Sequence, residues 1–424
     1  MLDFLQKKAS NILMFLFLIR LKSHDLENEE KILRIQNKNI KRLMKNAYKI
    51  PFYKQKFDAV GMKPEDFKTA EDLKKFPILT KDEIRNWILP EVNANPQKYK
   101  YWSAMSTSGS SGTPLTVYLS PMEYAKQNAN WIRIGQSNGY KLRYKTFTLR
   151  DPSIIKKRNG KDSIIQRICI ARRECLSSLC NGKEIYEYWN QYKPDYVYIQ
   201  RSKLFQTLMY VEKHNYALFV PKLCVVIGEG VDKEAYLLFD KHLHGVFCSS
   251  YGSVETGACT FSRKGTVNPH IITRDTHAIN IYQGRIVITN LFISGFPIIN
   301  YDINDGGEFI TLNGTTYLTN ILGRTNDFLT LKNGTTVSYQ SFYTIMEKKD
   351  NILQFRVIQE TYSHIHIQLV EKNNNFDKEI IEQEITEEVK NIIPDNYIVL
   401  TYEWLEELEP DENGKRRFII SKVK

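Results

Sequence analysis

The first stretch whose composition suits chemistry is rich in glycine and hydroxyl side chains and reads Ser106-Thr107-Ser108-Gly109-Ser110-Ser111-Gly112-Thr113-Pro114. Glycine lets a backbone approach a ligand closely, and free N–H groups with hydroxyls can surround an anion such as a triphosphate. The stretch is not a Walker A loop, because no Gly-Lys-Ser or Gly-Lys-Thr ends it. It also lacks the G-x-S-x-G spacing of a nucleophile elbow. The same composition is equally typical of a flexible linker.

A second motif follows an apolar run at 246–248 and reads Ser249-Ser250-Tyr251-Gly252-Ser253-Val254-Glu255. The aromatic ring of Tyr251 can stack on a base, and Gly252 permits close approach of a ligand. The carboxylate of Glu255 is the kind of oxygen ligand that Mg²⁺ accepts beside phosphates. The interpretation without function is a strand that leaves the core with a solvent-facing Glu255.

Three further charged residues complete a nucleotide-type set. Asp305 lies in a Tyr-Asp-Ile-Asn-Asp stretch, and a carboxylate can accept hydrogen bonds from both ribose hydroxyls. Arg324 follows a glycine and can bridge ribose and phosphate. Lys415 follows Gly414, and a lysine on a tight turn is a mobile point charge. The alternatives are an Asn-Asp-Gly-Gly turn at 304–307 and a basic tail at 413–417.

The elements that must position these residues alternate in type along the middle of the chain. The sequence predicts strands at Tyr196–Ile199 and Leu223–Ile227, with helices at Ser202–Val211 and Lys233–Phe239. This alternation is typical of an α/β domain. Further short strands are predicted at Ile286–Asn290, Glu308–Thr311 and Thr316–Asn320.

Helix signals dominate the first part of the chain. Apolar spacing predicts a helix over 25–50 that Pro51 ends, followed by a loop. Thr80 with Glu83 has the form of a capping box, and Ser120-Pro121 is a second helix start. The apolar run Ile12–Ile19 predicts an amphipathic or buried helix.

The C-terminal part has a different pattern. Strands are predicted at Ile352–Gln359, His364–Val370, Tyr397–Tyr402 and Arg417–Ser421, with a helix at Asp377–Asn391. We therefore expect a small β-β-α-β domain over residues 326–424 and a large α/β domain with mixed sheets over residues 1–325. His364 and His366 alternate on one strand face; we interpret them as a solvated face rather than a metal pair, since no third ligand is near in sequence.

Composition narrows the class of protein. The net charge of +11 suits an anionic partner, but Lys and Arg are scattered and no basic block with interleaved aromatics predicts nucleic-acid binding. The six cysteines form no C-x-x-C pair, which favours a reducing, cytoplasmic location. The run Ile12–Ile19 is too short to span a bilayer. Peripheral contact of residues 1–22 with the inner face of a membrane is left open, as is the oligomeric state.

In order and spacing, these motifs resemble the adenylate-forming superfamily. Within it, they resemble the phenylacetate–coenzyme A ligase-like branch, which includes proteins named for capsular polysaccharide biosynthesis. The resemblance covers nearly the whole chain. Other segments that carry it are Ile50-Pro51-Phe52-Tyr53, Asp72–Lys81, Lys193-Pro194-Asp195, Ser202-Lys203-Leu204 and Gly228-Glu229.

The resemblance implies a large adenylation domain, a small mobile domain that rotates about Thr325-Asn326-Asp327, and a set of site residues. These are Thr107, Ser108, Gly109, Ser110, Ser111, Gly112 and Thr113 for phosphate, Glu229, Ser250, Tyr251 and Gly252 for adenine, Asp305 and Arg324 for ribose, Glu255 for Mg²⁺, and Lys415 for catalysis. It implies that ATP and a small-molecule carboxylate form an acyl-AMP with Mg²⁺. An acceptor, coenzyme A or an amine, then takes the acyl group.

The sequence departs from the family pattern at several positions. Ser110-Ser111 stands where threonines are usual, and Val254 replaces the usual Thr before Glu255. Many relatives carry a zinc site with a C-x-C-G, but this chain has Thr311-Leu312-Asn313-Gly314 there. We therefore expect no zinc, because Cys259 and His270 alone cannot make a tetrahedral site.

Three functions remain open. The first is a carboxylate–coenzyme A ligase, and the second is an amide ligase that acts on an amino sugar or amino acid in surface-polysaccharide assembly. The third is an inactive nucleotide-binding scaffold. The presence of Glu255, Asp305, Arg324 and Lys415 together argues against the scaffold.

Overall fold

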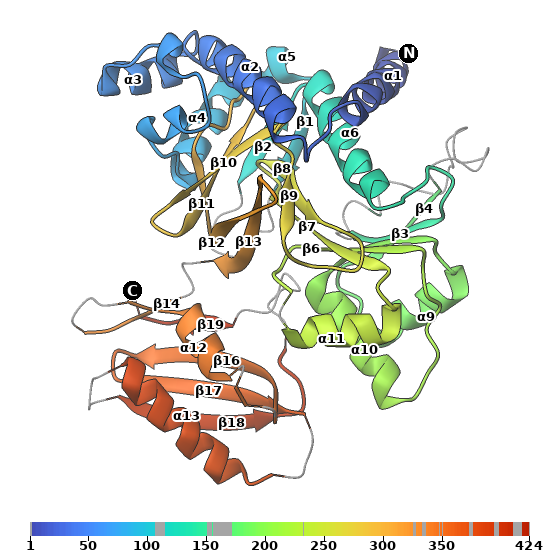
Figure 1. The fold of residues 1–424 in the computed structure, drawn as a ribbon, viewed down its shortest axis with the longest axis vertical. Helices are drawn as coiled ribbons and strands as arrows, with labels where there is room; N and C mark the ends of the chain where they lie inside the picture. The colour runs from blue at the N-terminus through green and yellow to red at the C-terminus, as the bar shows by residue number, and fades with distance from the viewer. Residues whose placement is uncertain are drawn as a thin grey trace. The chain divides into compact units, whose positions relative to one another are not determined.

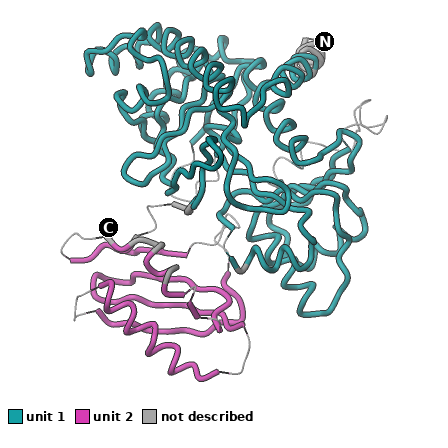
Figure 2. Tube along the Cα trace, in the orientation of Figure 1, with its two compact units in different colours: residues 1–321 teal, residues 322–424 magenta. Residues whose placement is uncertain are grey.

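The structure is a computed structural model that describes residues 2–106, 115–150, 155, 172–231, 233–324, 328–332, 336–346, 348–349, 351–372, 376–393, 398–409 and 418–423. The chain divides into two compact units, residues 1–321 and 322–424 (Figure 2). The expected boundary at Thr325-Asn326-Asp327 lies outside the described residues, so the functional domains 1–325 and 326–424 stay a prediction.

Helices make up most of the first part of unit 1. They are α1 (Leu2–Lys22), α2 (Glu29–Ala47), α3 (Pro51–Val60), α4 (Lys81–Ala94), α5 (Pro96–Tyr99) and α6 (Pro121–Ser137), with 3₁₀ turns at Pro64–Asp66 and Asp72–Lys75. Among the described helices, none is both long and apolar enough to cross a membrane.

The predicted helix starts are confirmed. The hydroxyl of Thr80 accepts the N–H of Glu83 at 3.3 Å, and the Glu83 carboxylate accepts the N–H of Thr80 at 2.8 Å, which caps α4. Ser120 and Glu123 make the same reciprocal pair at the start of α6. The preceding helix α2 ends at Ala47, before Pro51, but the loop predicted after Pro51 was wrong, because Pro51 begins the helix α3. Proline is favoured at the first helical position, where its missing N–H costs nothing.

The core of unit 1 is one sheet in the order β10-β11-β12-β13-β9-β8-β7-β6-β5-β3-β4 (Figure 1). Its strands are β3 (Thr146–Arg150), β4 (Arg173–Ser177), β5 (Tyr196–Gln200), β6 (Leu223–Ile227), β7 (Phe247–Ser253), β8 (Gly257–Ser262), β9 (His270–Ile272), β10 (His277–Tyr282), β11 (Arg285–Asn290), β12 (Tyr301–Leu312) and β13 (Thr315–Arg324). β3 to β7 pair in parallel, whereas β8 onward pair antiparallel where register is defined. The predicted α/β class with mixed sheets is confirmed.

Helices cover the parallel part of this sheet. They are α9 (Gly182–Tyr192), α10 (Arg201–Lys213) and α11 (Lys233–Leu243), and Figure 1 shows them gathered beside β3 to β6. A separate hairpin, β1 (Ser103–Ser106) and β2 (Thr116–Leu119), pairs Ser106 with Thr116. Their hydroxyls are 2.8 Å apart, so the hairpin holds together the two ends of the glycine-rich run.

Unit 2 is a small α+β body. Its elements are β14 (Phe328–Thr330), β15 (Thr336–Ser338), α12 (Tyr339–Met346), β16 (Ile352–Thr361), β17 (His364–Glu371), α13 (Lys378–Ile392), β18 (Val399–Leu405) and β19 (Ile419–Ser421). Four strands form a sheet in the order β18-β17-β16-β19, and the buried side chains of this sheet, of the β14-β15 hairpin and of the two helices share one core. The predicted strands and α13 are present; the sequence did not predict the β14-β15 hairpin or α12.

Candidate functional site

The second chemical motif lies at the end of β7, where the strand distorts. The register between β7 and β8 shifts between Tyr251 and Gly252. A Cβ added at Gly252 would stand 2.1 Å from the carbonyl oxygen of Gly257, so this position requires glycine. The bulge turns the chain out of the sheet at the carboxyl end of β7, where ligands of open parallel sheets usually bind.

A hydrogen bond joins Tyr251 to the predicted ribose residue. The Tyr251 hydroxyl donates to Oδ2 of Asp305 over 2.8 Å, although the two residues are 54 positions apart. Burial, and then the Asp305 charge, raises the pKa of Tyr251 well above its ordinary value, so the phenol stays a donor. β12 is four strands from β7 in the sheet, so this contact requires the sheet to curl strongly.

Asp305 does not sit in a turn between elements, as the alternative interpretation held. Residues Tyr301–Leu312 form the single strand β12, with a register shift opposite β11. Asn304 has φ +63°, and its N–H donates to Oδ1 of Asp302 at 2.9 Å. The Asn-Asp pair therefore makes a local distortion within the strand, which presents Asp305 toward Tyr251.

Glu255 is buried, with 5% of its surface exposed. The alternative interpretation, in which Glu255 faces solvent, is therefore wrong. Its Oε1 accepts the hydroxyl of Tyr301 at 3.1 Å. Its Oε2 makes no hydrogen bond to another described residue. The carboxylate thus keeps an oxygen that fits the oxygen-only preference of Mg²⁺.

Glu229 follows the carboxyl end of β6, the strand beside β7. Its Oε1 accepts the hydroxyl of Ser202 at 2.8 Å, and Ser202 lies in the first turn of α10, just after β5. Ser250 is buried on β7, and its hydroxyl donates to the carbonyl of Thr260 at 3.3 Å. Three neighbouring parallel strands therefore direct Ser202, Glu229 and Tyr251 to the same edge of the sheet.

Several predicted site residues lie outside the described part of the chain. They are Thr107, Ser108, Gly109, Ser110, Ser111, Gly112, Thr113 and Lys415. Arg324 ends β13, but its side chain is also outside the described set. Of the predicted set, the structure thus brings together Tyr251 and Asp305 directly and Glu229, Ser250, Gly252 and Glu255 around the β6–β7 edge.

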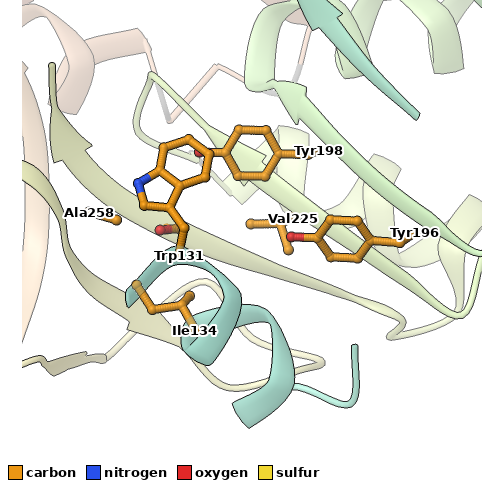
Figure 3. Close-up of a pocket in the computed structure, with 7 residues that line it drawn as sticks. Trp131, Ile134, Tyr196, Tyr198, Val225 and Ala258 are labelled. Atoms are coloured by element: carbon orange, nitrogen blue, oxygen red, sulfur yellow. The ribbon is translucent and has the colours of Figure 1, made fainter. Parts of the chain in front are cut away.

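A pocket between α6 and the sheet adjoins this site (Figure 3). Its cavity volume is about 10 Å³, room for roughly one water molecule, and it is lined by Trp131, Ile134, Tyr196, Tyr198, Val225, Ser250 and Ala258. The rings of Trp131 and Tyr198 lie 4.6 Å apart between centroids. The indole N–H of Trp131 is buried and has no hydrogen-bond partner among the described residues. Of these residues only Ser250 belongs to a motif of the sequence, where it was predicted for adenine; nothing in the sequence marked the others.

Glu123 fixes the helix that carries Trp131. Its Oε2 accepts the N–H of Ser120 at 2.9 Å, and its Oε1 accepts the N–H groups of Ser294 and Gly295 at 2.7 and 2.9 Å. One carboxylate therefore caps α6 and anchors it to the segment after β11.

His270 and Cys259, the two residues considered as zinc ligands, both contact other protein groups. His270 Nε2 lies 2.9 Å from the carbonyl of Val267, and Nδ1 lies 2.9 Å from the hydroxyl of Thr260. Burial lowers the pKa of His270 to about 4, so the ring is neutral, with Nε2 as donor and Nδ1 as acceptor. The Cys259 thiol lies 3.5 Å from the carbonyl oxygen of Tyr251, and burial raises its pKa.

The histidine pair of unit 2 also has protein partners. His364 Nε2 and His366 Nδ1 each lie 2.9 Å from the Thr401 hydroxyl, and His366 Nε2 is 3.1 Å from a Glu403 oxygen. Among the described residues of the whole chain, no group of three or more His, Cys, Asp or Glu could hold a metal ion.

Comparison with solved structures defines the class of fold. A 2-hydroxyisobutyryl-CoA ligase in the postadenylation state, in complex with R3-HIB-AMP, matches 93% of this chain and 90% of its own at TM-score 0.73 and 14% identity. An amide bond synthetase, McbA from Marinactinospora thermotolerans, matches 74% of this chain and 67% of its own at TM-score 0.52 and 12% identity. The fold is that of the adenylate-forming ligases.

Sequence comparisons refine this class. Residues 329–422 match the family model of the CapK C-terminal domain. The phenylacetate-coenzyme A ligase of Escherichia coli strain K12 is 36% identical over 84 residues, which are 20% of this chain and 19% of the relative. That of Aromatoleum evansii is 31% identical over 91 residues, 21% and 20% of the two chains. The aligned stretches thus span about a fifth of these relatives, and the resemblance to the phenylacetate–coenzyme A ligase-like branch is confirmed.

Proposed function

We propose that this protein is an ATP-dependent ligase that activates a small carboxylate as an acyl-AMP and passes the acyl group to an acceptor. The observation that carries the proposal is the hydrogen bond from Tyr251 to Asp305. It joins two motifs with nucleotide chemistry at the carboxyl edge of the parallel strands, in a fold shared with adenylate-forming ligases.

In the proposed first step, a carboxylate oxygen attacks the α-phosphorus of ATP, and the bond to pyrophosphate breaks. The protein contributes position and charge rather than covalent chemistry. Tyr251 packs against adenine, and Asp305 accepts the ribose hydroxyls while its Oδ2 is held by the Tyr251 hydroxyl. A carboxylate offers about four acceptor positions, so the tyrosine bond leaves capacity for ribose.

Glu255 is the residue we assign to Mg²⁺. Its buried carboxylate has one oxygen on the Tyr301 hydroxyl and one that bonds to no described residue. When bound, the ion would neutralise charge that develops on the phosphates. We assign the residues 107–113 to phosphate binding and Lys415 to catalysis on the family resemblance alone.

We assign the acyl end of the substrate to the small cavity beside Trp131, which must widen to admit it because its present volume is about 10 Å³. Ser250 lines that pocket near the carboxyl end of β7, one position before Tyr251, although successive side chains of a strand point to opposite faces. The apolar rings favour an apolar or aromatic acyl group. The unpartnered indole N–H favours an acid with a hydrogen-bond acceptor near its acyl end, because an unmet buried donor costs about 1–3 kcal/mol.

The proposed acceptor is coenzyme A, as in the phenylacetate-coenzyme A ligases to which the chain is similar. In the second step the acceptor sulfur attacks the acyl carbonyl carbon, and AMP leaves. An amine acceptor is the second candidate, favoured by the CapK C-terminal match and by the similarity to an amide bond synthetase.

A pyrophosphate-release assay with a panel of carboxylates tests this function. We expect release only when ATP, Mg²⁺ and a matching acid are all present. Added coenzyme A or amino sugars and amino acids then show which acceptor accelerates turnover. Binding of ATP without release for any acid would favour the inactive scaffold instead.

Trp131→Leu is the matched test of the acyl pocket. It keeps an apolar side chain but removes the indole N–H and ring. We expect the KM for the acid to rise while ATP affinity stays unchanged; an unchanged KM would remove the acyl group from this pocket.

A further inference from the structure

Helix α1 is apolar on two opposite faces. On one face Leu18 and Leu21 are buried against Ala129 of α6, and Met14 and Phe17 pack beside them. Figure 1 shows α1 lying alongside α6 at the surface of unit 1. This face is the ordinary contact of an amphipathic helix with the protein core.

The opposite face is exposed although it is also aliphatic. Ile12, Leu16 and Ile19 are 63%, 58% and 68% exposed. Their spacing of i, i+4 and i+7 places them on one side of the helix, about 180° from the buried set at 100° per residue. A stripe of three exposed large aliphatic side chains needs an explanation that the packing of α1 on α6 does not supply.

Positive charge gathers beside this stripe. Arg20 and Lys22 are exposed in the last turn of α1. Lys126 of α6 lies 5.1 Å from the ring centroid of Phe17, on the packed side of α1. The pKa of Lys126 is lowered by burial and then by the positive charges of Arg42 and Arg20. The pKa of Arg42 is lowered by burial and then by the charge of Arg20. The positive charges of Arg20, Arg42 and Lys126 therefore act on one another.

This cluster is weakly neutralised. Arg20, Arg42 and Lys126 form no ion pair within 4.0 Å to a described acidic side chain. The acid that acts on Lys126 is Glu123, whose Oε2 accepts the N–H of Ser120 at the start of α6 and whose Oε1 accepts the N–H groups of Ser294 and Gly295 after β11. A cationic cluster left in this state fits an anionic partner.

We propose that α1 docks on an anionic lipid surface, with Ile12, Leu16 and Ile19 in the acyl boundary and Arg20, Arg42 and Lys126 at the headgroups. An exposed aliphatic helix face bordered by basic residues is the pattern of an in-plane interfacial helix. A second copy of the chain is disfavoured as the occupant, because it would bring two like-charged clusters together. This inference goes beyond the proposed ligase function and does not depend on it.

Vesicle sedimentation with the full-length protein tests the proposal. The vesicles contain phosphatidylcholine alone or phosphatidylcholine with phosphatidylglycerol, at the same lipid concentration. We expect binding to the mixed vesicles, with a loss of roughly five-fold for each of Arg20→Gln and Arg42→Gln. Leu16→Glu should weaken binding at least ten-fold, on the order expected for placing a charge on the inserted face.

Leu237→Glu on α11 is the control, because Leu237 is 57% exposed, close to Leu16. It should bind as the wild type does, and circular dichroism should show that every variant is folded. Equal binding to both vesicle types, or binding to neither, would overturn the proposal. A dimer in solution that Leu16→Glu converts to a monomer would also overturn the proposal, because a second copy of the chain would then cover the stripe.

Discussion

At the residue scale, one tyrosine hydroxyl holds the carboxylate of the candidate ribose residue in place. Tyr251 donates to Asp305 across 54 positions of sequence, and its raised pKa keeps the proton on the phenol throughout the neutral and mildly alkaline range. The sequence could indicate that both residues suit a nucleotide. It could not show that they touch, because the contact depends on how far the sheet curls between β7 and β12.

Tyr251→Phe keeps the ring and removes only the donor. We expect ATP to bind about ten-fold more weakly, and Asp305→Ala to cost more, since hydrogen bonds to a charged group contribute about 1.5–3 kcal/mol each. Calorimetry on folded protein measures both. Tyr282→Phe, at an exposed tyrosine of β10, is the control. Unchanged ATP affinity in both site variants would leave the Tyr251–Asp305 bond as a purely structural contact.

Zinc content is a second test at this scale. We expect purified protein to hold no stoichiometric zinc, because Thr311 and Asn313 replace two thiolates and both His270 nitrogens already have partners. Elemental analysis after dialysis gives the answer. About one equivalent per chain would mean that the ligand set was misjudged.

At the element scale, buried polar side chains join helices to the sheet. Asp275, at the turn between β9 and β10, accepts Arg133 of α6 at 2.5 and 3.0 Å and lies 2.8 Å from His24 Nδ1, just after α1. Burial acts to raise the pKa of Asp275. The charge of Arg133 and the hydrogen bonds from His24 and Arg133 outweigh burial and lower the pKa to about 2.

Asp275→Asn should reduce the free energy of unfolding by about 3–5 kcal/mol, because it leaves the Arg133 guanidinium buried without a counter-charge. Glu30→Gln is the matched control: its pair with Arg34 is exposed on both sides, and such pairs contribute about 0–1 kcal/mol. Urea unfolding at pH 7 compares the two variants. Equal small losses in both would show that the Asp275 network contributes little to stability.

Stability should also fall with acid in a defined window. Burial lowers the pKa of His270 and of His277 to about 4 from an ordinary value near 6.5. Between these pH values the unfolded chain binds more protons than the folded one. The contribution of the two neutral histidines to the free energy of unfolding is therefore complete above pH 6.5 and is lost as pH falls toward 4. Urea unfolding at pH 7 and pH 5 measures the loss. A free energy of unfolding that is the same at both would contradict the buried neutral assignment.

Local signals predicted most elements because their causes are local. Thr80 with Glu83 and Ser120 with Glu123 are caps that need only four residues. Helix α3 was missed because Pro51 is equally compatible with ending one helix and starting another. Apart from Ser250, the lining of the pocket under Trp131 had no signal in the sequence, since it comes from α6 and four strands that only the tertiary fold brings together.

At the scale of the whole molecule, the central claim is that the carboxylate joins the α-phosphorus of ATP. Lys415→Ala should abolish this step and leave ATP binding nearly intact, because one cation at the reacting phosphate acts mainly on the transition state. If that variant released pyrophosphate with the carboxylate as fast as the wild type does, Lys415 would have no catalytic role in this step.

The most direct measurement uses a substrate carboxylate labelled with ¹⁸O on both oxygens, with ATP, Mg²⁺ and the acceptor found in the release assay. Attack on the α-phosphorus leaves one labelled oxygen bridging acyl carbon and phosphorus, and attack of the acceptor on the carbonyl carbon releases it on AMP. We predict AMP that carries one ¹⁸O, by mass spectrometry, together with unlabelled pyrophosphate. Label in inorganic phosphate with ADP as the nucleotide product, or AMP without label, would contradict the account.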